Sequence, residues 1–246
     1  EKKNINKSLV TSSSTDLVRV NNSLVITNKI LTENSNRYLN NFSGQTLWSI
    51  NLFDKMRVRN IIDYDENNEV IVAGTNGIIY FLSKKDGAVT NKINIGIPVY
   101  ELCLVKNDEV HLLFAGVMSG ELFKINLGDD LNYSKFQAHR SAITGVLFSK
   151  QFNFIITTST DGYIKIWDIL KDNLIKNIDA HVLTESFGIY NDIVISSGLS
   201  GEIKFHSLPE LKLINVYKGN KEREFQKQIA INNKLNRLAL GSSMES

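Results

Sequence analysis

Short apolar runs, rich in β-branched and aromatic residues, recur along the chain and are separated by small polar turns. The clearest example is Phe152–Ser159 (FNFIITTS), which is followed by an Asp161-Gly162 turn and by Tyr163–Ile169 (YIKIWDI). In the second run apolar and polar positions alternate, as they do in a half-buried strand. An Asp-Gly pair supplies the positive φ angles that a tight hairpin turn needs. Because no segment keeps a helical apolar period, the pattern predicts an all-β chain.

The same strand–turn–strand pattern occurs four times, and each copy carries a glycine in its turn. The four copies are Glu69–Ser83, His111–Asn126, Phe154–Asp168 and Asp192–Ser207. The turn glycines are Gly77, Gly120, Gly162 and Gly201. They follow one another at intervals of roughly 40 residues, a spacing typical of propeller blades built from four strands. Such a sheet cannot bury both faces alone, so the repeat predicts sheets stacked radially, face against face.

We therefore expect one all-β domain, a propeller of six or seven blades of which about five and a half are present, incomplete at the C-terminus. The expected units are 15–52, 57–95, 98–136, 139–180, 182–217 and 224–246. In the first unit, Leu17–Ile30 is expected to supply the first two strands, Arg37–Phe42 the third and Gln45–Leu52 the fourth. The last unit holds two strands, so we expect fast hydrogen exchange over Leu238–Ser246 if they are unpaired.

One repeat, 138–169, carries a pattern that resembles a WD40 repeat. Its residues AHRSAITGVLFSKQFNFIITTSTDGYIKIWD combine a leading histidine, a Ser-x-Asp-Gly turn and a closing Trp-Asp pair. The neighbouring units keep the glycine and the strands but lack these signature residues. The position of Trp167 is taken by Leu82, Ile125 and His206, and that of Asp161 by Asn76, Ser119 and Ser200.

The resemblance implies a buried hydrogen-bonded chain in this repeat, formed by His139, Ser159 or Thr157, Asp161 and Trp167. A buried indole needs an acceptor and a buried carboxylate needs donors, so each group can satisfy the next. The competing interpretation, a catalytic triad, is disfavoured because every member already has a structural role. The acidic pairs elsewhere lie in expected turns, so we expect no enzyme.

The composition limits the cellular compartment and the kinds of site that we expect. The single cysteine, Cys103, excludes an internal disulfide framework and fits a reducing compartment, so we expect an intracellular protein of the cytoplasm or nucleus. No apolar run reaches the ~18 residues of a membrane span, so no membrane insertion is expected. His111, His181 and His206 lack metal-ligand spacing. We expect no metal, no cofactor and no small-molecule substrate.

The WD40 resemblance implies a binding function: a non-catalytic scaffold that docks a peptide or a partner protein within a multiprotein complex. In that family partners lie over the narrower end of the ring. Carried over position by position, the contact residues are Tyr100, Met118, Ala142, Thr144, Thr160 and Leu199. Large apolar side chains at exposed turns suit an interface core. Whether Tyr100 instead packs within its own blade stays open at this point.

A different class of function rests on basic residues in the connections between units. Arg57, Arg59, Lys218, Lys221 and Arg223 would form a phosphate-binding patch if they met on one face. The chain would then be an accessory RNA- or DNA-binding subunit of a nucleic-acid-processing complex. The formal net charge of +2 and the acids interspersed in these loops favour solvated loops instead.

Overall fold

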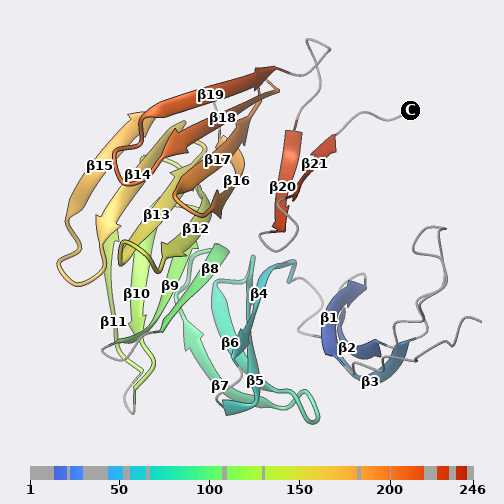
Figure 1. The fold of residues 1–246 in the computed structure, drawn as a ribbon. Helices are drawn as coiled ribbons and strands as arrows, with labels where there is room; N and C mark the ends of the chain where they lie inside the picture. Colours follow the sequence, from blue (N-terminus) through green and yellow to red (C-terminus); the bar gives the residue numbers. More distant parts are fainter. Residues whose placement is uncertain are drawn as a thin grey trace, which may run out of the picture.

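A computed structural model of the chain shows an all-β molecule (Figure 1). The described residues are 14–20, 23–29, 44–51, 56–64, 67–106, 110–128, 131–181, 184–199, 201–218, 226–232 and 237–242. They form 21 strands, grouped in six antiparallel sheets.

Four of the sheets have four strands each and follow one another along the chain. The first comprises β4 (Val58–Tyr64), β5 (Glu69–Gly74), β6 (Ile78–Ser83) and β7 (Val89–Asn94). The second comprises β8 (Val99–Lys106), β9 (His111–Val117), β10 (Glu121–Asn126) and β11 (Tyr133–Gln137). The third comprises β12 (Ile143–Ser149), β13 (Phe154–Ser159), β14 (Tyr163–Asp168) and β15 (Leu174–Asp179). The fourth comprises β16 (Thr184–Tyr190), β17 (Ile193–Gly198), β18 (Glu202–Ser207) and β19 (Leu213–Lys218).

Two smaller sheets stand at the chain's two ends. They are β1 (Ser14–Val20), β2 (Ser23–Lys29) and β3 (Gly44–Asn51), and the pair β20 (Gln226–Asn232) and β21 (Arg237–Ser242). In Figure 1 β20 and β21 continue the series after β16–β19.

The strand division predicted for the first unit is wrong. β2 pairs directly with β3, and Ile26 lies opposite Trp48. The register then shifts by one residue, as it does between the third and fourth strands of the β4–β7 sheet. β1, β2 and β3 thus take the places of the second, third and fourth strands of a blade. The expected third strand, Arg37–Phe42, lies outside the described residues.

Neighbouring sheets pack through their first strands. β4 contacts β8, β8 contacts β12, β12 contacts β16 and β16 contacts β20, so the sheets follow an arc (Figure 1). Burial falls from the inside of this arc to the outside. Every residue of β13 is buried, whereas β15 carries four exposed residues in a row. Radial stacking explains this gradient, because it covers both faces of an inner strand and leaves the fourth strand at the rim.

Close approach between sheets depends on glycines in the inner strands. A Cβ atom on Gly188 of β16 would lie 2.6 Å from Ile231 Cδ1 of β20, and a Cβ on Gly145 of β12 would overlap the ring of Phe187 of β16. Each glycine thus receives a side chain from the next sheet along the arc. This interlocking brings the neighbouring sheets into close contact.

Candidate interaction surface and the blade that supports it

The hydrogen-bonded chain of the third complete sheet centres on Thr157. The indole Nε1–H of Trp167 donates to Thr157 Oγ1 (2.8 Å), which lies 2.8 Å from His139 Nε2. The other ring nitrogen, His139 Nδ1, lies 3.0 Å from both carboxylate oxygens of Asp161. If the threonine hydroxyl donates to Nε2 and Nδ1–H donates to Asp161, every group in the chain is satisfied.

Ser159, the first of the two alternatives named from the sequence, does another task. Its Oγ donates to the carbonyl of Ser141 (3.1 Å) and accepts from the backbone N–H of Asp161 (3.0 Å). It therefore fixes the turn rather than the histidine. Thr157 and Ser159 lie on the same face of β13, two residues apart. The position of the His139 imidazole along that strand decides which of the two hydroxyls it contacts.

Electrostatics favour a neutral histidine beside an ionised aspartate. Burial lowers the pKa of His139 to about 4, and the nearby charge of Asp161 raises it only in part. Burial acts to raise the pKa of Asp161, but hydrogen bonds from the backbone N–H groups of Arg140 and Tyr163 outweigh it and leave that pKa below its ordinary value. A neutral His139 keeps one ring nitrogen as an acceptor for Thr157. Because Thr157 is fully buried, its hydroxyl is not positioned to attack a substrate from solvent.

The next sheet carries a partial copy of this chain. His181 Nε2 lies 3.0 Å from Ser196 Oγ, and His206 stands where the tryptophan stood. The Nδ1 atoms of His181 and His206 are buried and make no hydrogen bond to a described residue. Ser200, in place of the aspartate, lies outside the described residues. In the first two complete sheets the positions equivalent to Thr157 and Trp167 are apolar, so packing replaces the hydrogen bonds there. These positions are Val72, Leu82, Ala115 and Ile125.

Stability is expected to fall as the pH is lowered from about 6.5 towards about 4. Burial lowers the pKa of His139, His181 and His206 to about 4, so between these values the unfolded chain binds protons that the folded chain does not. Glu101 acts in the opposite direction, because burial raises its pKa to about 7. Each histidine left uncompensated lowers the free energy of unfolding by about 1.4 kcal/mol per pH unit.

Urea unfolding at pH 7, 6 and 5 measures this dependence. His181→Gln should reduce the slope of the free energy of unfolding against pH by the contribution of one histidine. A midpoint that stays constant between pH 7 and pH 5 would show that the histidines are not held neutral by the fold.

One end of the arc is built from equivalent turns. The residue after the second strand donates its N–H to the residue before the first strand in three sheets: Thr75 to Arg57 O (3.0 Å), Met118 to Pro98 O (2.9 Å) and Thr160 to Ala142 O (3.0 Å). The turn glycines stand at this same end and have positive φ. Leu199 occupies the same position after β17 in the fourth sheet. We call this end the turn end.

The residues predicted to bind a partner are not equally available at the turn end. Met118 is 49% exposed, whereas Ala142, Thr160 and Leu199 are half-buried. The hydroxyl of Thr144 donates to the carbonyl of Thr184 in the next sheet (2.8 Å). Thr144 therefore links two sheets, and its polar group is not presented to a partner.

Tyr100 lies at the start of β8 and is half-buried. The guanidinium carbon of Arg59, on the neighbouring β4, lies 4.7 Å from the centre of its ring. This cation–π contact crosses from one sheet to the next, so Tyr100 packs between blades. Next to this pair, the side-chain amide of Asn60 donates to Glu101 Oε2 (2.9 Å) and makes a second link between β4 and β8.

A β-bulge that was not predicted from the sequence recurs in the first strand of five sheets. In each case the register with the second strand skips one residue, which leaves that residue unpaired. The unpaired residues are Arg59, Tyr100, Thr144, Glu185 and Lys227. Because a bulge re-aims a side chain and bends the strand, these five positions form an equivalent set along the inner strands.

The structure does not bring the described basic residues together. Arg57 and Arg59 stand at the beginning of the innermost strand of the β4–β7 sheet, and both are exposed. Lys218 ends the outermost strand of the β16–β19 sheet, three sheets further on, and lies 3.2 Å from Glu202. Lys221 and Arg223 lie outside the described residues. The patch predicted from the loops is therefore divided between distant strands.

Within the part of the chain that the structure covers, no group of three or more His, Cys, Asp or Glu side chains could hold a metal ion. A search of the same residues finds no helix long and apolar enough to cross a membrane.

Comparison with known proteins identifies the hydrogen-bonded sheet. Residues 132–168, which include His139, Thr157, Asp161 and Trp167, match the family model described as WD domain, G-beta repeat. The chain contains a WD40 repeat. The four-stranded sheets that flank this WD40 repeat are blades of the same architecture, with the signature residues replaced by apolar side chains or by histidine.

Relatives and solved structures agree with the WD40 assignment. COMPASS component SWD3 of Saccharomyces cerevisiae is 27% identical over 131 residues, which is 52% of this chain and 41% of SWD3. Target of rapamycin complex subunit LST8 of the same yeast is 26% identical over 108 residues, 44% of this chain and 36% of LST8. The chain thus spans less than half the length of these two relatives.

The crystal structure of Saccharomyces cerevisiae Sqt1 superposes with a TM-score of 0.69 at 14% identity. The match covers 85% of this chain and 61% of Sqt1. At this identity the likeness concerns the fold alone.

Proposed function

We propose that the chain is a non-catalytic scaffold that docks a partner protein within an intracellular multiprotein complex. The observation that carries the proposal is the equivalence of the turns at the turn end. Three of them are held by the same backbone hydrogen bond, and this end presents Met118 from the β8–β11 sheet and Leu199 from the β16–β19 sheet. Turns fixed in this way lose little conformational entropy on binding.

The relatives support this class of function. SWD3 is named as a component of COMPASS and LST8 as a subunit of the target of rapamycin complex. Both names describe assembly with other proteins. The formal net charge of +2 and the separation of Arg57 and Arg59 from Lys218 give no support to a nucleic-acid patch. Association with the partner should accordingly depend little on salt.

The test is the loss of a purified partner upon truncation of the apolar side chains at the turn end. Met118→Ala combined with Leu199→Ala is expected to weaken binding by at least about tenfold, since an interface anchor typically contributes more than about 1 kcal/mol. Adding Tyr100→Ala should weaken it further, but this change also removes the contact with Arg59. The double variant therefore remains the primary measurement.

The control removes two apolar side chains at the rim whose exposure is similar to that of Met118. Leu174→Ala combined with Leu213→Ala truncates two residues that are 46% and 50% exposed on the fourth strands. This control should bind the partner as the unchanged chain does. Binding that survives the triple change at the turn end, with circular dichroism and thermal midpoint intact, would refute the assignment of this face.

A further inference from the structure

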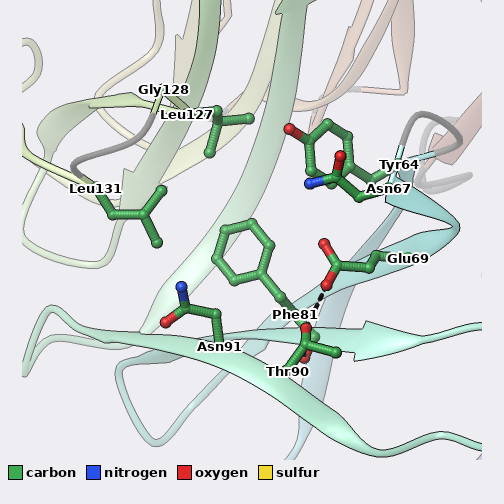
Figure 2. A pocket seen from close by; sticks show the side chains of 9 residues that line it. All are labelled: Tyr64, Asn67, Glu69, Phe81, Thr90, Asn91, Leu127, Gly128 and Leu131. Atoms are coloured by element: carbon green, nitrogen blue, oxygen red, sulfur yellow. Dashed lines mark hydrogen bonds between the residues drawn. The ribbon is translucent and has the colours of Figure 1, made fainter.

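A small pocket lies between the β4–β7 and β8–β11 sheets, at the end of the arc opposite the turn end. It has a volume of about 200 Å³, and Figure 2 shows its side chains. The ring of Phe81 stands in the middle, between leucines on one side and Glu69 and Tyr64 on the other. The lining residues used below are Tyr64, Glu69, Phe81, Asn91, Leu127 and Leu131. None of them was singled out by the sequence.

The polar groups of this pocket include one carboxylate, that of Glu69. Thr90 Oγ1 donates to Glu69 Oε1, and Glu69 Oε2 makes no hydrogen bond to another described residue (Figure 2). Asn67 and Asn91 also line the pocket, and the side-chain oxygen of Asn91 already accepts from the backbone N–H of Lys92 (2.8 Å). Tyr64 is 4% exposed, and its pKa is raised first by burial and then by the negative charge of Glu69. A carboxylate and aromatic faces together are surroundings that a cation prefers.

Glu69 is the one charged residue of this lining. Lys84, on the turn that follows β6, pairs with Asp63. The lining therefore carries a negative charge.

From this lining, size and charge we infer that the pocket receives the arginine side chain of a partner protein. A volume of about 200 Å³ is smaller than the ~300–1,000 Å³ of sites for drug-sized ligands, and it suits one long side chain. The guanidinium is planar, so it can stack on an aromatic ring while its N–H groups reach the carboxylate of Glu69. Leu127 and Leu131 cover its aliphatic stem.

This inference concerns a second surface and goes beyond the proposed function. The pocket and the turn end lie at opposite ends of the strands, because Tyr64 ends β4 and Glu69 begins β5, whereas Met118 follows the end of β9. A scaffold with both sites can hold two segments of a complex at once, which gains affinity through effective concentration.

The experiment uses the whole chain and two short peptides, acetyl-Gly-Arg-Gly-amide and the same peptide with citrulline in place of arginine. Citrulline has the shape of arginine without its charge. The amide NMR signals of Asn91 and Leu131 should shift with the arginine peptide, with a Kd on the order of 1 mM for one side chain. The citrulline peptide should shift them at least about fivefold less at equal concentration.

Glu69→Gln tests the carboxylate while retaining an oxygen that can accept from Thr90. It should weaken binding of the arginine peptide at least about fivefold. The matched control is Glu210→Gln, an exposed acid at the same end of the β16–β19 sheet, which should leave the Kd unchanged. Equal shifts with citrulline, or an unchanged Kd in Glu69→Gln, would overturn the inference. The Met118→Ala/Leu199→Ala variant should bind the arginine peptide normally, so the proposals for the two surfaces are tested independently.

Discussion

Replacing Thr157 by valine is expected to lower the free energy of unfolding by about 2–4 kcal/mol, as measured by urea denaturation. Valine keeps the shape of the side chain but removes the one oxygen that serves two partners. Trp167 Nε1–H loses its acceptor, and His139 Nε2 loses its neighbour at 2.8 Å. Both groups stay buried, so each incurs the desolvation cost of an unpaired polar atom. Thr157 itself is fully buried, which prevents water from replacing the hydroxyl.

Thr158→Val is the matched control for this change. Thr158 is equally buried at the next position of β13, and its hydroxyl lies 3.2 Å from one other hydroxyl, Thr144 Oγ1. Its loss should lower the free energy of unfolding by only about 1 kcal/mol. Equal effects of the two substitutions, or an effect of Thr157→Val below that of the control, would mean that the histidine and the tryptophan do not depend on this hydroxyl.

Gly120→Ala is expected to lower the free energy of unfolding by about 3 kcal/mol or more, through two separate causes. Gly120 has a φ of +83°, where a Cβ is strained by its own backbone. The added Cβ would also lie 2.6 Å from the carbonyl oxygen of Ser141, and closer still to that of His139. These obstacles are backbone atoms at the junction of two sheets, and they cannot rotate away. The turn must open, which disturbs the WD40 repeat next to it.

Gly96→Ala separates the two causes. Gly96 has a similar φ of +77°, but no atom lies within 4 Å of the position that a Cβ would take. Alanine there should lower the free energy of unfolding by only about 1–2 kcal/mol, from the left-handed backbone alone. Thermal or urea unfolding of both variants measures the difference. Equal losses would show that the sheets are not packed as closely at Gly120 as the structure has them.

The repeated part of the fold could be predicted because its signals are local. Gly77, Gly120, Gly162 and Gly201 all adopt the positive φ that their turns require. The alternating apolar runs beside them became the second and third strands of the complete sheets. Each strand pair is close in sequence, so the hydrophobic pattern and the turn residue decide it together.

The strands of the first unit were assigned wrongly because local sequence signals do not show which strand of a blade a segment forms. The Asn21-Asn22 turn fits a connection between any two strands. The decisive fact, that β2 pairs with β3 across residues 30–43, is a long-range one. Sequence analysis could not decide between Ser159 and Thr157 for a similar reason, since both point to the same face of β13. The pocket around Phe81 was missed because its lining comes from connections and strands of two sheets.

Double electron–electron resonance on the chain with Cys103→Ser tests the arrangement of the sheets around a common axis most directly. Spin labels belong on the exposed, equivalent fourth-strand positions Asn91, Ser134, Lys176 and Asn215. Sheets around one axis predict equal distances between neighbouring labels and a distance from Asn91 to Asn215 of only about twice the neighbouring one. A distance close to three times the neighbouring one would mean a straight stack of sheets, and it would contradict the ring and the interaction surface built on it.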